Sequence, residues 1–317
     1  MSTDIAIPAI EQMLADDAYR QKKQQCAQFA EERFSSLLAD LARDIDTLHA
    51  SHGPISLYVL DSLPSVYLDT LAALSPEESG LLAKHIVASR LEALPANLIT
   101  WALPPGIVLQ YIDAVRYMTQ SIVSQGDAEY GDVRSSYFDR DLRLTSGLSL
   151  PLGAQIIDLR VWAPRTLYRN KGLVENLRCL LFVKLHLRGL GPLVRIHADS
   201  RMAGSFNEEG RIACFLQIAQ LMALMPDIRG FIGTSWYYDP QVKTISPKLA
   251  YLSRIPMENG AFLRVDGSGD IHTQRALERS PTRRQLFEEG KYKPVCATMI
   301  WTREKLMEWA RKYERSH

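Results

Sequence analysis

The segment from residue 194 to 201 carries the side chains best suited to chemistry in this chain of 317 residues. Side chains alternate across a strand, so His197 and Asp199 share one face with the arginines that flank them. An earlier predicted strand shows the same alternation at Asp158 and Arg160. Charged groups inside a cavity must be paired, so we expect His197 and Asp199 to line a polar cavity with Asp158 or Arg160 close by. Cross-strand ion pairs on an open sheet face are the alternative.

The residues after this strand form a glycine turn that leads directly into a predicted helix. Ser205 is expected to be the N-cap, and Glu208, three residues later, completes a capping box. Backbone amides at the start of a helix bind anions. Arg201, Gly204 and Ser205 are therefore the candidate cofactor-binding residues.

The strand, turn and helix resemble the GNAT acyltransferase family. Its signature is a strand, then Arg/Gln-x-x-Gly-x-Gly/Ala, then a helix whose first amides hold the pyrophosphate of acyl-coenzyme A. Arg201 and Gly204 match the first and fourth positions, and Phe206 stands where the motif has Gly or Ala. The order of predicted elements across residues 156–265 is also similar, except that a helix at 170–189 replaces antiparallel strands. The resemblance implies a mixed sheet covered by helices, and acyl-coenzyme A or an acyl-carrier thioester as the acyl donor.

The resemblance also implies a reaction, in which the acyl group moves from the thioester to an amine. His197, Asp199 or Glu208 would take the amine proton. Tyr237 or Tyr251 would protonate the leaving thiolate, and Tyr251 lies on a later predicted helix, where some family members carry a general acid. We expect no metal ion, because the four cysteines form no CxxC pair and the sequence has no HExxH motif.

Two alternatives to an acyltransferase stay open. His197, Asp199 and the distant His272 have the composition of a 2-His-1-carboxylate iron site, and Arg283 would suit a 2-oxoglutarate carboxylate, as in Fe(II) oxygenases. The helices predicted between the two histidines leave too few strands for the barrel that carries such a site. The other alternative is a non-catalytic small-ligand-binding or interaction module that keeps the fold without the chemistry.

The N-terminal part of the chain is predicted to be mostly helical. Apolar residues recur at helical spacing in 8–49 and 108–122. Residues 75–94 open with Ser-Pro-Glu-Glu, a strong helix start. A short apolar run at 55–60 predicts a strand. Charges of alternating sign between glycines mark 126–150 as an exposed connector or lid.

The C-terminal half alternates strands with helices, which is typical of an α/β sheet covered by helices. One of these helices follows Asn170 and ends at Gly189. Its predicted apolar face consists of Leu173, Leu177, Leu180 and Leu181. We therefore expect a helical region at 1–125, the charged connector at 126–150 and an α/β domain at 151–317.

The composition limits the class of protein. With 37 Lys+Arg and 36 Asp+Glu, the formal net charge is +1, so nothing in the whole-molecule charge favours nucleic acid or an anionic membrane as a partner. No apolar run approaches the roughly 20 residues of a membrane-spanning helix, and the acidic N-terminus lacks the pattern of a secretory signal. We expect a cytoplasmic protein with a small-molecule substrate. The sequence leaves its oligomeric state open.

Overall fold

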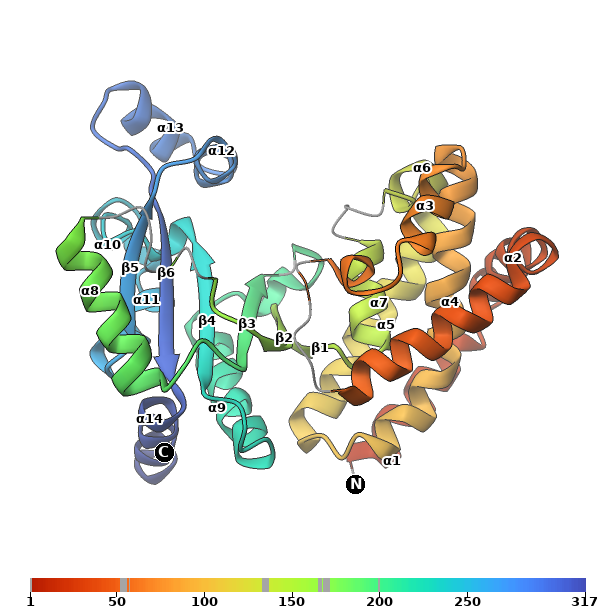
Figure 1. Cartoon of the computed structure of the whole chain (residues 1–317), viewed down its shortest axis with the longest axis horizontal. Helices are drawn as coiled ribbons and strands as arrows, with labels where there is room; N and C mark the ends of the chain where they lie inside the picture. The colour runs from red at the N-terminus through yellow and green to blue at the C-terminus, as the bar shows by residue number, and fades with distance from the viewer. Residues whose placement is uncertain are drawn as a thin grey trace. The chain divides into compact units, whose positions relative to one another are not determined.

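The chain forms two compact units in the computed structural model, which we describe separately. Unit 1 comprises residues 1–161 and 198–204, and unit 2 comprises residues 162–197 and 205–317. Figure 1 colours the chain by residue number, so elements before residue 161 run from red to yellow-green and those after residue 205 from turquoise to blue. The structure describes residues 2–51, 56, 58–132, 137–164, 167, 172–198 and 200–317.

Unit 1 is built mainly from helices and carries one antiparallel hairpin, in which β1 pairs with β2. Its elements are α1 (Ser2–Leu14), α2 (Asp17–Ser51), the 3-10 turn η1 (Val59–Ser62), α3 (Val66–Ala72), α4 (Pro76–Thr100), α5 (Pro105–Ser124), α6 (Asp127–Tyr130), α7 (Phe138–Thr145), β1 (Ser149–Leu152) and β2 (Gln155–Val161).

A local sequence signal sets the start of α4. The Ser75 hydroxyl accepts a hydrogen bond from the Glu78 amide, and the Glu78 carboxylate accepts one from the Ser75 amide, so the predicted capping box is confirmed. The helix predicted over 8–49 is divided in two near Asp16. The strand predicted at 55–60 is wrong for Val59 and Leu60, which begin η1. Ile55 and Leu57 lie outside the described residues.

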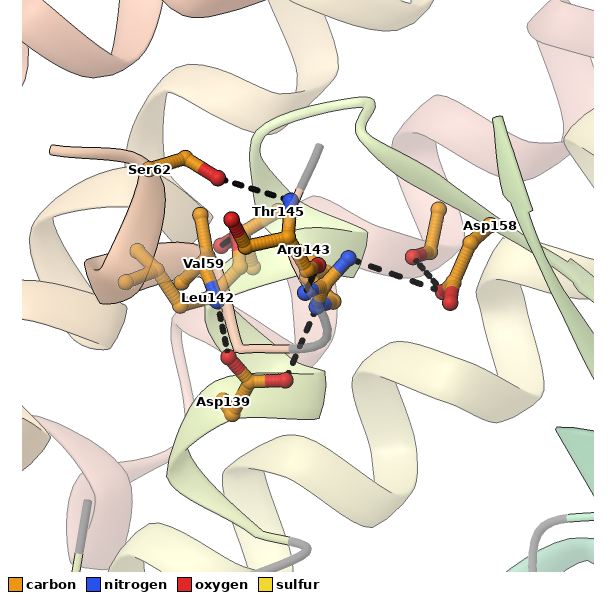
Figure 2. A network of polar contacts seen from close by, with 9 residues as sticks. Val59, Ser62, Asp139, Leu142, Arg143, Thr145 and Asp158 are labelled. Atoms are coloured by element: carbon orange, nitrogen blue, oxygen red, sulfur yellow. Dashed lines mark hydrogen bonds and ion pairs between the residues drawn. The ribbon is translucent and has the colours of Figure 1, made fainter. Parts of the chain in front are cut away.

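Much of the predicted connector at 126–150 is buried, so its interpretation as an exposed segment is wrong. Every residue from Asp141 to Leu150 is buried, and α7 and β1 pack against each other and against the long helices α4 and α5. The reason is that charges of this run pair inside unit 1: Arg143 pairs with Asp139 and Asp158, and Asp141 pairs with Arg201. Figure 2 shows the centre of this polar network.

Arg143 is the hub of the network, and its side chain is only 3% exposed. Its Nε donates a hydrogen bond to Asp139 Oδ2 at 2.8 Å, and its Nη2 donates to the carbonyl oxygen of Ser56 at 2.7 Å. Its Nη1 lies 3.8 Å from Asp158 Oδ1, which also accepts a 2.7 Å hydrogen bond from the Ser149 hydroxyl (Figure 2). One guanidinium thus holds together α7, β2 and the segment that leads into η1.

Asp139 shows how far this network is removed from water. Its Oδ1 accepts a hydrogen bond from the Val59 amide at 2.5 Å, in addition to the contact with Arg143. Burial raises the pKa of the Asp139 carboxyl, while the Arg143 guanidinium acts in the opposite direction. The ion pair therefore lies in a low-dielectric environment, where each charge needs the other to offset its loss of hydration.

Unit 2 contains a mixed sheet with the strand order β3-β4-β6-β5. β3 is parallel to β4, whereas β6 is antiparallel to both β4 and β5. The elements of unit 2 are α8 (Leu173–Phe182), the π-helical turn η3 (Val183–Leu187), β3 (Leu193–Ala198), α9 (Glu208–Leu224), β4 (Gly230–Ser235), η5 (Trp236–Tyr238), α10 (Val242–Ile245), η6 (Pro247–Leu249), α11 (Tyr251–Glu258), β5 (Phe262–Gly267), α12 (Asp270–Glu278), α13 (Pro281–Glu288), β6 (Cys296–Thr302) and α14 (Arg303–Ser316).

Aromatic side chains fill the core between this sheet and two of its helices. Phe215 of α9 meets Trp301 of β6 edge-to-face at 5.2 Å between ring centroids, and it meets Trp309 of α14 at 6.0 Å. Such pairs add about 0.5–1.5 kcal/mol beyond their burial. The chain is therefore an α/β protein with an open mixed sheet and a helical N-terminal region. None of the helices described here combines the length and apolarity that crossing a bilayer requires.

Replacing Arg143 with Met should lower the free energy of unfolding by about 3–5 kcal/mol, because it leaves buried carboxylates without their counter-charge. Arg116→Met is the matched control, since Arg116 and Asp113 form an ion pair of which both side chains are about half exposed. Its cost should be about 0–1 kcal/mol. Urea unfolding followed by circular dichroism measures both. Equal losses in the two variants would show that the network does not stabilise unit 1.

Candidate functional site

The start of α9 differs in detail from its prediction. Asn207 is the N-cap, and its side-chain oxygen accepts a hydrogen bond from the Gly210 amide at 2.8 Å. Ser205, the predicted cap, instead ends the 3-10 turn η4 (Ser200–Ser205). The predicted capping box with Glu208 is therefore wrong: Asn207 lies one residue before the helix and reaches its third residue. Glu208 and Glu209 place two carboxylates in the first turn.

Two of the predicted cofactor-binding residues belong to unit 1. Arg201 is mostly buried and its Nη2 lies 2.7 Å from Oδ1 of the fully buried Asp141. Its guanidinium also lies over the Tyr137 ring, 5.5 Å from the centroid. Gly204 is exposed, and a Cβ added there would meet no atom within 4 Å. Arg201 thus has a structural partner, whereas the backbone at Gly204 is open to a ligand.

His197 lies near the end of β3 and is half-buried. The described register of β3 with β4 pairs Val194 with Phe231 and Arg195 with Ile232. It covers only the first half of each strand, and His197 lies beyond it. Asp199 lies outside the described residues, so the shared cavity of His197 and Asp199 stays a prediction.

A buried arginine lies close to where this register ends. The Arg211 Nη2 donates a hydrogen bond to the Tyr238 hydroxyl at 2.8 Å, and both side chains are buried. A Cβ added at Gly233 of β4 would lie 2.8 Å from that hydroxyl and 2.9 Å from a methyl group of Ile196. Only glycine allows this approach. The hydroxyl and its cation are therefore held against the second half of β3 and β4.

Tyr251 is the first residue of α11, which packs against α9 and η5. Its side chain is 8% exposed, and its hydroxyl has no hydrogen-bond partner among the described residues. Burial raises the pKa of Tyr251, the nearby Arg211 lowers it, and Glu208 and Tyr237 raise it further. A buried hydroxyl that lacks a partner costs about 1–3 kcal/mol, which makes this position a candidate ligand site.

The strand predicted to reach Tyr238 ends at Ser235, and η5 follows. Tyr237 therefore does not follow strand alternation. Its ring packs edge-to-face against Trp236 at 4.8 Å and against Phe206 at 6.0 Å.

Glu208 forms an ion pair with Arg254 of α11. Both side chains are about half exposed, so the Glu208 carboxylate stays accessible to solvent. We use the name tyrosine cluster for Glu208, Arg211, Tyr237, Tyr238 and Tyr251. All five lie in unit 2, and the sequence predicted three of them.

Arg211 and Tyr238 are the members that the sequence did not select as site residues. Arg211 continues the apolar stripe of α9 at helical spacing with Phe215, Ile218 and Met222, all of them buried. An arginine in such a stripe must be paired inside the protein. That signal identifies a buried cation, but it does not identify its tyrosine partner.

Of the residues of the alternative iron site, Asp199 lies outside the described residues. His272 lies on α12, a helix, instead of on a barrel strand. Arg283 donates to the Ala276 carbonyl and the Ser246 hydroxyl, and it stacks over Trp236. In the part of the chain that the structure describes, no group of three or more His, Cys, Asp or Glu side chains could hold a metal ion.

Unit 1 offers two hollows to the ligand-binding alternative. One has a volume of about 510 Å³ and is lined by Ile7, Pro95 and Ile99, among others. The second, of about 530 Å³, is lined by residues that include Tyr19 and Val123. None of the residues predicted to be catalytic or cofactor-binding lines either hollow.

Comparison with known proteins assigns no family to this chain, so the interpretation of the site rests on its geometry. No family model matches the chain, and searches of curated proteins and of solved structures give no match.

Replacing Asn207 with Ala should cost about 1 kcal/mol of stability, because the amides at the start of α9 lose their cap. Ser205→Ala is the control, and we expect it to change stability by less than about 0.5 kcal/mol. Chemical denaturation of both variants measures the difference. A larger loss in the Ser205 variant would restore the original capping prediction.

Proposed function

We propose that this protein is an acyltransferase that moves an acyl group from a pantetheine thioester to an amine, with Tyr251 as the proton donor. The observation that carries the proposal is the buried Tyr251 hydroxyl, which has no partner among the described residues and lies near the cationic Arg211. The chain order β3, α9, β4, α11, β5 also supports it, because it is the order that the resemblance to GNAT acyltransferases implies.

The proposed reaction needs one base and one acid. The amine nitrogen attacks the thioester carbonyl carbon, so that a C–N bond forms, the C–S bond breaks and its electron pair leaves on sulfur. Tyr251 gives its proton to that sulfur, and the amine gives a proton to Glu208 or His197. Solvent then returns a proton from the base to Tyr251, which leaves an amide and a free thiol as products.

The surroundings of Tyr251 suit the role of acid. A tyrosine hydroxyl is protonated at neutral pH, so the proton is present when the thiolate leaves. Burial raises the pKa of Tyr251 and so opposes the transfer, while Arg211 lowers it. The positive charge of Arg211 favours the tyrosinate that forms for a moment after the transfer. Tyr238 orients Arg211 through their 2.8 Å hydrogen bond.

The start of α9 bears on the choice of acyl donor. Carboxylates in the first turn of a helix compete with a bound anion for the helix dipole, and α9 carries Glu208 and Glu209 there. Arg201 is already paired with Asp141. The open backbone at Gly204 and Ser205 is the remaining candidate for holding a diphosphate. We therefore describe the acyl donor by its pantetheine thioester, which coenzyme A and carrier proteins share, and not by a diphosphate.

Tyr251→Phe should lower the rate of thiol release by about 10²-fold or more, because the reaction loses its acid. The variant should be at least as stable as the wild type, since the lost hydroxyl makes no described hydrogen bond. Tyr313→Phe on α14 is the control and should keep full activity. Acetyl-pantetheine and acetyl-coenzyme A, each with a panel of primary amines, are the substrates. No thiol release by the wild type with any pair would reject the proposal and favour a binding module.

Gly204→Val tests the diphosphate site and should leave stability unchanged, because a side chain at this position meets open space. If the backbone there holds a diphosphate, the variant should bind acetyl-coenzyme A at least about tenfold more weakly, through loss of amide contacts. Its affinity for acetyl-pantetheine should not change. Calorimetry gives both values, and equal binding of acetyl-coenzyme A by wild type and variant would remove Gly204 from the site.

A further inference from the structure

One helix of unit 2 exposes an apolar surface that the proposed function does not use. The outward side chains of α8 and η3 are mostly aliphatic, and we call this surface the α8 face. Its apolar members and their exposed fractions are Leu173 (85%), Val174 (82%), Leu177 (51%), Leu180 (47%), Leu181 (46%) and Leu185 (62%). They recur at the spacing of one helix face.

The sequence predicted that this leucine face would be the buried one, and the structure shows the reverse. α8 packs through its other side, where Cys179 is fully buried and the Phe182 ring stacks on Phe262 of β5 at 4.3 Å. The Arg178 guanidinium lies over the same Phe262 ring, 4.7 Å from its centroid. Figure 1 shows α8 alongside β5. The helix is thus attached to the sheet without its most apolar face.

The charged side chains of this helix differ between its two sides. Glu175 is on the packed side, where its Oε1 lies 3.9 Å from the Cys179 sulfur. Lys184 and Arg188 are exposed. They follow Leu177 and Leu181 by seven residues each, which is two helical turns, so they belong to the same outward side as those leucines. The α8 face therefore combines aliphatic side chains with positive charge.

The sequence around the helix is basic as well. Within residues 162–197 the one acidic residue is Glu175. The basic residues of the same range are Arg165, Arg169, Lys171, Arg178, Lys184, Arg188 and Arg195. The formal charge of +1 for the whole chain thus conceals a local excess of positive charge.

We infer that the α8 face binds the surface of an anionic lipid bilayer, with the helix lying in the plane of the membrane interface. Leucines on such a helix enter the boundary between the head groups and the acyl chains. Lys184 and Arg188 keep their charged ends among the lipid phosphates, while their aliphatic stems lie along the apolar layer. Each basic side chain near an anionic membrane strengthens the attraction.

The same observations favour a bilayer over a second copy of the chain. Two copies that meet through this face would desolvate Lys184 and Arg188 without a counter-charge, because Glu175 is on the packed side of the helix. Lipid phosphates supply that counter-charge. Leu173 and Val174 are also more than four-fifths exposed. Side chains with so few contacts enter a fluid apolar layer without needing a partner of matching shape.

Co-sedimentation of the full chain with lipid vesicles tests the inference. We expect binding to vesicles of equal parts phosphatidylcholine and phosphatidylglycerol, and at least about tenfold weaker binding to phosphatidylcholine alone. L177E/L181E should weaken binding to the mixed vesicles by at least about tenfold, because it puts charges among the acyl chains. L224E is the matched control, since Leu224 of α9 is 59% exposed and lies outside the α8 face.

A charge reversal tests the part played by the basic residues. K184E/R188E should weaken binding to the mixed vesicles by at least about tenfold. R311E/R315E is the matched control, because it changes the net charge equally at two exposed positions that are also four residues apart, on α14. We expect it to bind like the wild type.

The control arginines belong to a helix on the other side of the sheet. Phe262, on which α8 packs, pairs with Ile300 of β6. The next residue of β6, Trp301, points to the opposite side, where it contacts Trp309 of α14 at 5.4 Å between ring centroids. A bilayer bound to the α8 face therefore does not need α14.

Four results would overturn the inference. They are no binding of the wild type to either vesicle, equal binding to both, a control variant that weakens binding as much as its partner, and a lipid-free dimer that L177E/L181E dissociates. Sedimentation velocity detects that dimer, which would assign the α8 face to a second copy. None of these measurements uses a substrate, so they are independent of the proposed function.

Discussion

Unit 1 depends on one constraint: a charge taken out of water must meet its counter-charge inside the protein. Arg143 satisfies it through Asp139, Asp158 and a backbone carbonyl, and so joins segments that are far apart in the sequence. Asp141 satisfies it through Arg201, which belongs to unit 1 although a segment of unit 2 separates it in the sequence from the rest of that unit. These pairs give unit 1 a polar interior that fixes which segments belong together.

The tyrosine cluster of unit 2 follows the same rule in part. Arg211 has the Tyr238 hydroxyl, and Glu208 has Arg254. The Tyr251 hydroxyl has no such partner among the described residues. Folding does not favour an unpaired buried group, so its presence is better explained by function than by stability. The proposed function is assigned to unit 2 because this hydroxyl lies near Arg211 and Glu208.

Gly233 shows how packing and site are connected. Its missing side chain allows the Tyr238 hydroxyl to approach β4, and this hydroxyl in turn orients Arg211. The exposed leucines of α8, among them Leu173, Leu177 and Leu181, lie on the same unit but have a different physical origin. They remain at the surface because α8 packs through Cys179 and through the stacking of Phe182 on Phe262.

The sequence by itself determined what depends on neighbouring residues. The capping box at Ser75 formed as expected, because a cap and its partner are three residues apart. The strand that carries Asp158 and Arg160 and the α/β alternation of the C-terminal half also formed, since their periodicity is a local property. His197 was selected by strand alternation, and Tyr251 by the position that the resemblance implies.

Tertiary structure decided which face of each element is buried and which charge meets which. Asn207 replaced Ser205 as the cap because η4 extends to Ser205. The charged run at 126–150 became buried because Asp158 and Arg201, distant in sequence, supply its counter-charges. Periodicity shows that α8 has an apolar face, but only the packing of Phe182 on Phe262 shows that this face is outside. Long-range pairing has no local signature, and for that reason only the folded chain reveals it.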